Sequence, residues 1–136
     1  MTRDDLVAAA RQCLGTPFRH QGRALGRGLD CVGLLIHVAH GVGLQTDDPC
    51  DYGRQPAHGL LERHLAAAGL APIPPVAALP GDVLLFRIDG PAQHVALASD
   101  KGMIHAYALA RRVVEHRLDP VWRARLVGAY RFPGVS

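Results

Sequence analysis

The sequence is poor in aromatic residues and in lysine, and it lacks a long unbroken apolar run. Phenylalanine, tryptophan and tyrosine make up 5% of the 136 residues, and Lys101 is the only lysine among the 15 basic residues. The net charge of +3 is small and no block of like charges forms a basic arm, so we expect no nucleic-acid partner. Histidines and glycines interrupt the longest apolar segment, residues 31–44, so we expect no membrane insertion either.

Cysteine is scarce as well. The three cysteines are an odd number without disulfide-like spacing, so we expect no disulfide scaffold; Cys13 should fill the core and Cys50 should lie in a polar loop. The first residues contain no apolar stretch of signal-peptide length. We therefore expect the chain to be made in the cytoplasm and any export to use another route. Its length and 49% apolar content predict one folded domain over residues 1–136.

The order of the hydrophobic patterns predicts an α+β fold. Helical periodicity covers residues 2–14, 31–40 and about 58–68, with glycine-rich or polar loops between them and an extended connector over 72–80. Short strands are predicted from residue 80 onward, within 80–86, 94–99, 103–108, 111–118 and 126–132, with a helical turn at 119–125. Helices followed by strands indicate an antiparallel sheet packed against a central helix, which begins at Cys31.

Cys31 is the first candidate for chemistry. It follows Asp30, which is a good N-cap residue, so its thiol should lie in the first turn of a helix. Free backbone N–H groups and the helix dipole favour a thiolate there and can lower the pKa of a cysteine. The same N–H groups are candidate donors to an oxyanion. A cysteine at the start of a buried helix can also be a simple packing residue, so this position alone does not decide between the two.

Two histidines supply candidate bases. His94 begins one strand of a predicted hairpin and His105 lies in the next. If the turn has an even number of residues and Ala98 pairs with Met103, both imidazoles lie diagonally on one face, whereas a three-residue turn puts them on opposite faces. His94 would then take the proton of Cys31 and His105 would orient His94. The alternatives are unrelated surface histidines, a zinc site of these three residues, or a metal site at His37 and His40.

Five short segments, in this order, carry a resemblance to a known family. They are "LGTPFRHQG" (14–22), "DCVGLL" (30–35), "LPGDVLLF" (79–86), "QHVALA" (93–98) and "MIHA" (103–106). Over residues 5–132 the chain resembles the NlpC-type cell-wall cysteine endopeptidases. These papain-like enzymes cleave peptidoglycan stem peptides, typically between D-glutamate and diaminopimelate or lysine. The resemblance implies a papain-like fold with the nucleophile at the N-terminus of a central helix, peptidoglycan as the partner, no cofactor and no metal.

The resemblance also assigns roles to residues. Cys31 matches the family nucleophile, His94 its base and His105 its third polar residue. The family commonly has a tyrosine where this chain has Phe18, so a hydroxyl group is missing there. We predict that the substrate-binding residues are Phe18, Arg19, His20, Gln21 and Asp30. Charge alone suggests that Arg19, Arg23 or Arg27 attracts the carboxylates of the stem peptide.

The short "HQG" form of the upstream loop (20–22) and the small size suggest a subgroup. They resemble the stand-alone peptidases encoded beside tail genes in phages and gene-transfer-agent-like particles. We therefore expect tail hub or tail-tip proteins as partners, and action at the periplasm and cell wall on a virion-like particle. Two rival hypotheses remain: an amidase that cleaves the sugar–peptide bond on the same fold, and a structural tail component with a vestigial site.

Overall fold

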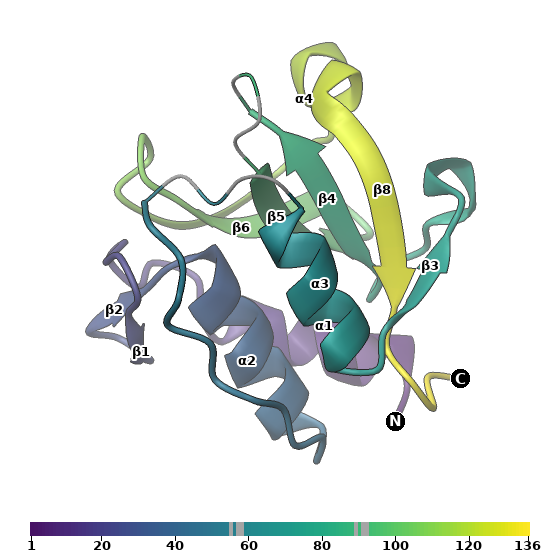
Figure 1. The fold of residues 1–136 in the computed structure, drawn as a ribbon, viewed down its shortest axis with the longest axis horizontal. Coiled ribbons are helices and arrows are strands. Elements are labelled where there is room, and N and C mark those ends of the chain that lie inside the picture. Colours follow the sequence, from purple (N-terminus) through teal and green to yellow (C-terminus); the bar gives the residue numbers. More distant parts are fainter. Residues whose placement is uncertain (55, 57–58, 89, 91–92) are drawn as a thin grey trace.

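One antiparallel sheet with helices packed on it makes up the protein, as a computed structural model shows (Figure 1). The structure describes residues 1–54, 56, 59–88, 90 and 93–136. Three helices, α1 (Arg3–Arg11), α2 (Cys31–Gly41) and α3 (Leu60–Ala67), belong to the first half of the chain. The predicted α+β class, with helices first and strands later, is confirmed.

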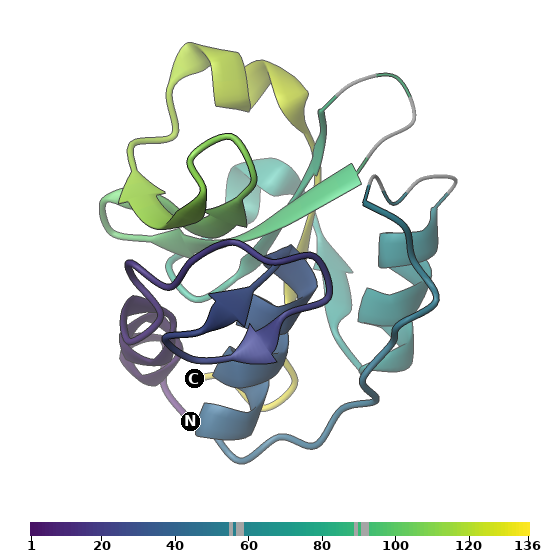
Figure 2. The ribbon, with the colours of Figure 1, turned by 90° about the vertical axis from the view of Figure 1, so that its left-hand side faces the viewer.

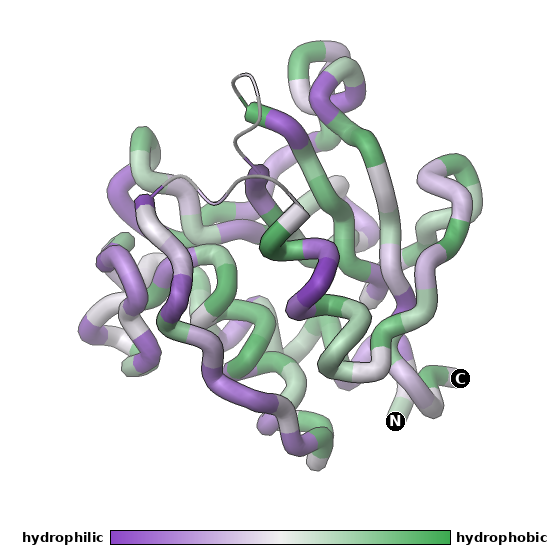
Figure 3. The backbone as a smooth tube through the Cα atoms, in the orientation of Figure 1, coloured by the Kyte–Doolittle hydropathy of each residue, from purple (hydrophilic) through white to green (hydrophobic). Residues whose placement is uncertain are grey.

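The ends of α1 and α2 are set by side-chain caps. Thr2 and Asp5 form a capping box at the start of α1, with each side chain bonded to the backbone of the other residue. Asp30 caps α2 through a bond from the Gly33 N–H, as its position in the sequence predicted. Most residues of α2 are buried, and its tube in Figure 3 is mainly hydrophobic. This helix is therefore the central one of the domain.

The sheet has six antiparallel strands in the order β3-β8-β4-β5-β6-β7. Their bounds are β3 (Ala71–Ile73), β4 (Val83–Arg87), β5 (Gln93–Ser99), β6 (Gly102–Tyr107), β7 (Arg112–His116) and β8 (Leu126–Arg131). The last strand, β8, lies between β3 and β4, so the chain returns to the middle of the sheet at its end. The predicted turn at 119–125 forms the short helix α4 (Pro120–Arg125).

Two apolar clusters lie on the two faces of the sheet. Alternate side chains such as Val95, Leu97 and Ile104 pack with α1 and α2 in the larger cluster, which also contains the fully buried Cys13. The other face carries Phe86, Ala96 and Met103, covered by Trp122 of α4. Which face a side chain takes therefore decides which helices it meets.

Two segments differ from the sequence-based expectation. The predicted loop over 16–29 contains a small antiparallel pair, β1 (Arg23–Ala24) and β2 (Gly28–Leu29), which lies beside α2 (Figure 2). The predicted extended connector overlaps the end of β3 and contains a short 3-10 helix, η1 (Pro75–Ala77). The start of the third predicted helix, His58, lies outside the described residues. Local patterns missed these elements because β3 is specified by pairing with β8, far away in the sequence.

Candidate active site

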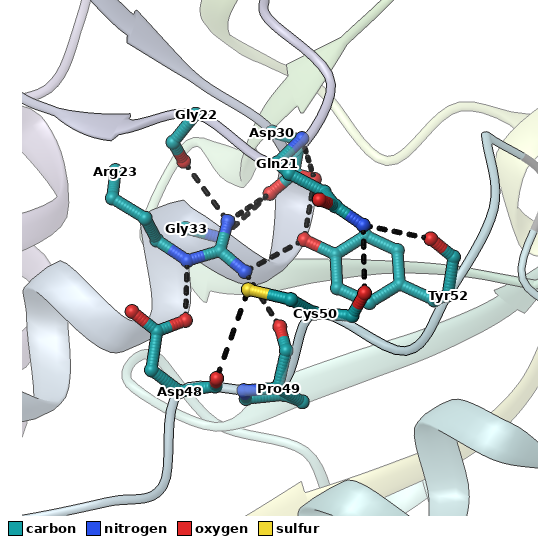
Figure 4. A network of polar contacts seen from close by, with 9 residues as sticks. All are labelled: Gln21, Gly22, Arg23, Asp30, Gly33, Asp48, Pro49, Cys50 and Tyr52. Atoms are coloured by element: carbon teal, nitrogen blue, oxygen red, sulfur yellow. Dashed lines mark hydrogen bonds and ion pairs between the residues drawn. The ribbon is translucent and has the colours of Figure 1, made fainter.

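Asp30 holds the start of α2 in place through a buried polar network (Figure 4). One carboxylate oxygen accepts from the Gly33 N–H at 2.8 Å and from Arg23 at 3.0 Å. The other accepts from the Gln21 N–H at 2.8 Å and from the Tyr52 hydroxyl at 2.6 Å. Four donors thus fix a carboxylate that is 3% exposed, and they aim it at backbone and side-chain donors, not at the thiol.

The same network ties the segment 48–52 to the helix start. Arg23 donates to Asp48 at 2.7 Å, to the Pro49 carbonyl at 2.9 Å and to the Tyr52 hydroxyl at 2.8 Å. The Gln21 side chain donates to the carbonyls of Cys50 and Tyr52 at 3.0 and 2.9 Å. Sequence reasoning missed Tyr52, because nothing in the local pattern says that a tyrosine 22 positions away will bind Asp30.

Cys31 lies where strands β5 and β6 stop pairing. The ladder between β5 and β6 ends at Leu97 and Ile104, so the strands part beyond that pair. Ala98 donates its N–H to the carbonyl of Asp82 and accepts from the N–H of Gly81, so its backbone groups face the β4 side. In a strand, every second residue directs its N–H to the same side, and the residues between them direct theirs to the opposite side. Val95 is an odd number of residues from Ala98, so its N–H faces the β6 side, beyond the last β5–β6 pair. There it interacts with the Cys31 sulfur, as do the N–H groups of Val32 and of Cys31 itself.

His94 and His105 meet on one face of the sheet, as the register argument predicted. Ala98 pairs with Met103 and the turn between Ser99 and Gly102 has two residues, so the expected even turn is confirmed. His94 Nε2 lies 2.7 Å from His105 Nδ1. Both rings are buried, with His94 8% exposed and His105 fully enclosed. Since Nε2 of His94 is occupied, Nδ1 is the nitrogen that remains to take up a proton.

A third histidine extends this pair. His105 Nε2 lies 2.8 Å from His116 Nε2, and His116 Nδ1 lies 2.8 Å from the carbonyl oxygen of Arg117. His116 is the last residue of β7, next to β6 in the sheet. The sequence analysis did not include it. The regular spacing of His94, His105 and His116, 11 residues each, was the available signal, because the two hairpins place them on neighbouring strands.

Burial controls the charge states of Cys31 and His94. It raises the pKa of the Cys31 thiol to about 12, and the nearby charge of Asp30 adds to the rise. The backbone N–H groups of Val95, Val32 and Cys31 lower the pKa, but burial outweighs them. The expected net lowering at the helix start is therefore wrong. Burial, with a smaller contribution from Arg125, lowers the pKa of His94 to about 3, so thiol and imidazole are both neutral at rest.

The predicted substrate-binding residues lie in the segment that precedes α2. Phe18 is half-buried against the larger apolar cluster, and Arg19 is exposed with its stem over Gly28. His20 packs edge-on against Tyr52, with ring centroids 5.7 Å apart. The polar groups of Gln21 and Asp30 bond within the network described above, and so does the guanidinium of Arg23. Substrate binding by these residues stays a prediction.

The alternatives based on metal ions gain no geometric support. Among the residues that the structure describes, no group of three or more histidine, cysteine, aspartate or glutamate side chains is arranged to hold a metal. His94 and His105 direct nitrogens at each other, not toward a common point. Each helix in the described ranges is too short or too polar to cross a membrane.

Comparison with known proteins agrees with this geometry. The model of the NlpC/P60 family matches residues 15–131. An NlpC/P60 family protein from Bacillus cereus superposes with a TM-score of 0.74 at 25% identity, over 97% of this chain and 40% of that one. The chain thus spans about two fifths of that relative. No curated protein matches.

Two further solved structures share the fold. The NlpC/P60 domain of the peptidoglycan hydrolase SagA has a TM-score of 0.71 at 24% identity, covering 97% of this chain and all of that domain. The peptidoglycan hydrolase RipB from Mycobacterium tuberculosis has a TM-score of 0.68 at 21% identity, covering 95% and 63%. The fold is the papain-like one of cysteine hydrolases, with Cys31 at the start of its central helix. The chain belongs to the NlpC/P60 family.

Proposed function

We propose that this protein is a cysteine endopeptidase that cleaves peptidoglycan stem peptides, at the bond between D-glutamate and diaminopimelate. The observation that carries the proposal is the hydrogen-bonded pair of buried histidines, on a strand whose residue next to His94, Val95, presents its N–H to the thiol at the N-terminus of α2. Cys31 acts as the nucleophile, His94 as the general base and His105 as the residue that orients His94. Exposure of 8% for both Cys31 and His94 leaves them within reach of an incoming peptide.

The reaction starts from the neutral pair. As the Cys31 sulfur attacks the scissile carbonyl, its proton passes to Nδ1 of His94, and the carbonyl oxygen becomes an oxyanion. The N–H groups of Val95, Val32 and Cys31, which interact with the sulfur, are the candidate donors to that charge. His94 then gives the proton to the leaving amine as the carbon–nitrogen bond breaks. Water, deprotonated by His94, hydrolyses the thioester and returns the thiol.

Digestion of purified cell wall tests this proposal. Wall fragments released by the purified protein are analysed by mass spectrometry, with Cys31→Ala as the inactive variant and Cys50→Ala, an exposed cysteine, as the matched control. The proposal predicts peptide fragments with a new amino terminus at diaminopimelate for the wild type and Cys50→Ala, and none for Cys31→Ala. Release of whole stem peptides from the glycan would show an amidase instead. Digestion that survives in Cys31→Ala would overturn the thiol mechanism.

The finer part of the proposal concerns delivery. The short "HQG" segment favours a peptidase carried by a phage-like tail, which opens the wall locally. Particles purified from the producing strain should then contain the protein together with tail hub or tail-tip proteins, and Cys31→Ala particles should lose infectivity. Absence of the protein from such particles would refute this delivery route, and full infectivity of Cys31→Ala particles would favour the structural role.

A further inference from the structure

The three histidines form a continuous hydrogen-bonded chain with a fixed end. It runs from His94 to His105 at 2.7 Å, from His105 to His116 at 2.8 Å, and from His116 to the carbonyl of Arg117 at 2.8 Å. A neutral imidazole has one nitrogen that donates and one that accepts, whereas a carbonyl oxygen only accepts. The direction of every bond in the chain therefore follows from its last member.

The carbonyl of Arg117 fixes which nitrogen donates in each hydrogen bond of the chain. His116 Nδ1 must carry a proton in order to donate to Arg117, so its Nε2 accepts. His105 then donates from Nε2, and its Nδ1 accepts. His94 in turn donates from Nε2 to His105, which leaves the lone pair of His94 on Nδ1. That nitrogen is the one not bound to His105, so it is the position from which a base acts on a thiol.

We propose that His116 is a positioning residue, which fixes the tautomer of His94 through His105 so that Nδ1 is free to accept a proton. The inference rests on the proposed roles of Cys31 and His94 and goes beyond them. If the chain ran in the opposite direction, Nδ1 of His94 would already carry a proton and could take none from Cys31. The wrong tautomer of a catalytic histidine is costly: in serine proteases it lowers kcat by about 10⁴-fold.

The packing around the chain keeps His116 as the partner of His105. The His105 ring is fully enclosed, stacked at 5.1 Å on Tyr107 and held edge-on at 5.0 Å by Trp122. Trp122 also lies against His94 and His116, at 5.8 and 6.0 Å. His116 is half-buried, so the chain runs from the enclosed site toward the surface of the protein. A buried donor at His105 Nε2 without its acceptor is unfavourable, so His116 acts on both members of the pair.

Nitrogen-15 NMR of the histidine rings tests the proposal directly, because the shifts of the two ring nitrogens report the tautomer. Wild-type His94, assigned from the spectrum of His94→Gln, should show the proton on Nε2. His116→Leu removes the acceptor and should give a mixture of both His94 tautomers. His116→Gln keeps a carbonyl oxygen near the place of Nε2 and should preserve the wild-type state. His40→Gln, on the exposed end of α2, is the control for losing any histidine.

Kinetics on a soluble stem peptide give the second readout. We expect His116→Leu to lower kcat in proportion to the fraction of His94 that keeps its proton on Nε2, about twofold for an even mixture, with KM unchanged and with recovery in His116→Gln. A His94 proton on Nδ1 in the wild type, or equal losses in the leucine and glutamine variants, would overturn the inference. The tautomer measurement does not need activity, so it still decides this point if Cys31→Ala shows that the thiol mechanism is wrong.

Discussion

Replacement of Asp30 by asparagine should lower stability and raise thiol reactivity at the same time. In Asp30→Asn, one oxygen still accepts from Gly33 and Arg23, but an amide NH2 now faces the N–H of Gln21 and the hydroxyl of Tyr52. Each buried donor that loses its acceptor costs about 1–3 kcal/mol, although the Tyr52 hydroxyl is able to rotate. With the loss of the charge opposite Arg23, we expect the free energy of unfolding to fall by about 3 kcal/mol.

Urea unfolding measures that loss, and for a domain of this size it corresponds to a fall in Tm of roughly 10 °C. Asp48→Asn is the matched control, because Asp48 contacts the same Arg23 but is exposed, so the expected change is under about 1 kcal/mol. A loss in Asp30→Asn no larger than in Asp48→Asn would refute the assignment of Asp30 as the centre of the network.

The thiol provides the second measurement. The charge of Asp30 raises the pKa of Cys31, so its removal lowers that pKa, and alkylation of the thiol should begin at a lower pH than in the wild type. The rate of iodoacetamide modification against pH, followed by mass spectrometry, reports this shift. An alkylation profile displaced to higher pH in Asp30→Asn would contradict the electrostatic argument.

Two further predictions concern stability. In Gly33→Ala the added Cβ would collide with the carbonyl oxygen of Gly22. We therefore expect a loss of stability in urea unfolding that outweighs the gain of about 1 kcal/mol for alanine over glycine in a helix. Equal or greater stability of the variant would show that the contact relaxes. Burial lowers the pKa values of His94 and His105, so below about pH 6.5 the unfolded chain binds protons that the folded chain does not. Stability should therefore fall as pH drops from about 6.5 toward 4, and a flat profile in urea titrations would contradict it.

Local patterns were enough to predict the part of the site that depends on one element. The cap at Asp30 follows from a polar residue just before an apolar run. For His94 and His105, the alternation of side chains predicted a shared face only if the turn was even, and the sequence left a three-residue turn open; the structure shows the even turn. The cap is a relation between residues close in sequence, so a single chain contains that information.

What the sequence did not predict depends on contacts across the chain. The position of β8 between β3 and β4 and the bond from Tyr52 to Asp30 join elements that are far apart in the sequence. The direction of the Cys31 pKa shift was missed for the same reason. A helix N-terminus is visible in the sequence, whereas the burial that outweighs it results from packing against the sheet.

The parting of β5 and β6 has an evolutionary consequence. It leaves the Val95 amide facing Cys31, and an amide N–H belongs to the backbone of every residue except proline. Substitution of Val95 by any residue other than proline therefore leaves that donor in place. The surroundings of the sulfur are in this way partly encoded by strand pairing and not by residue identity, so distant sequences with this sheet can retain the same polar environment for a cysteine at this place.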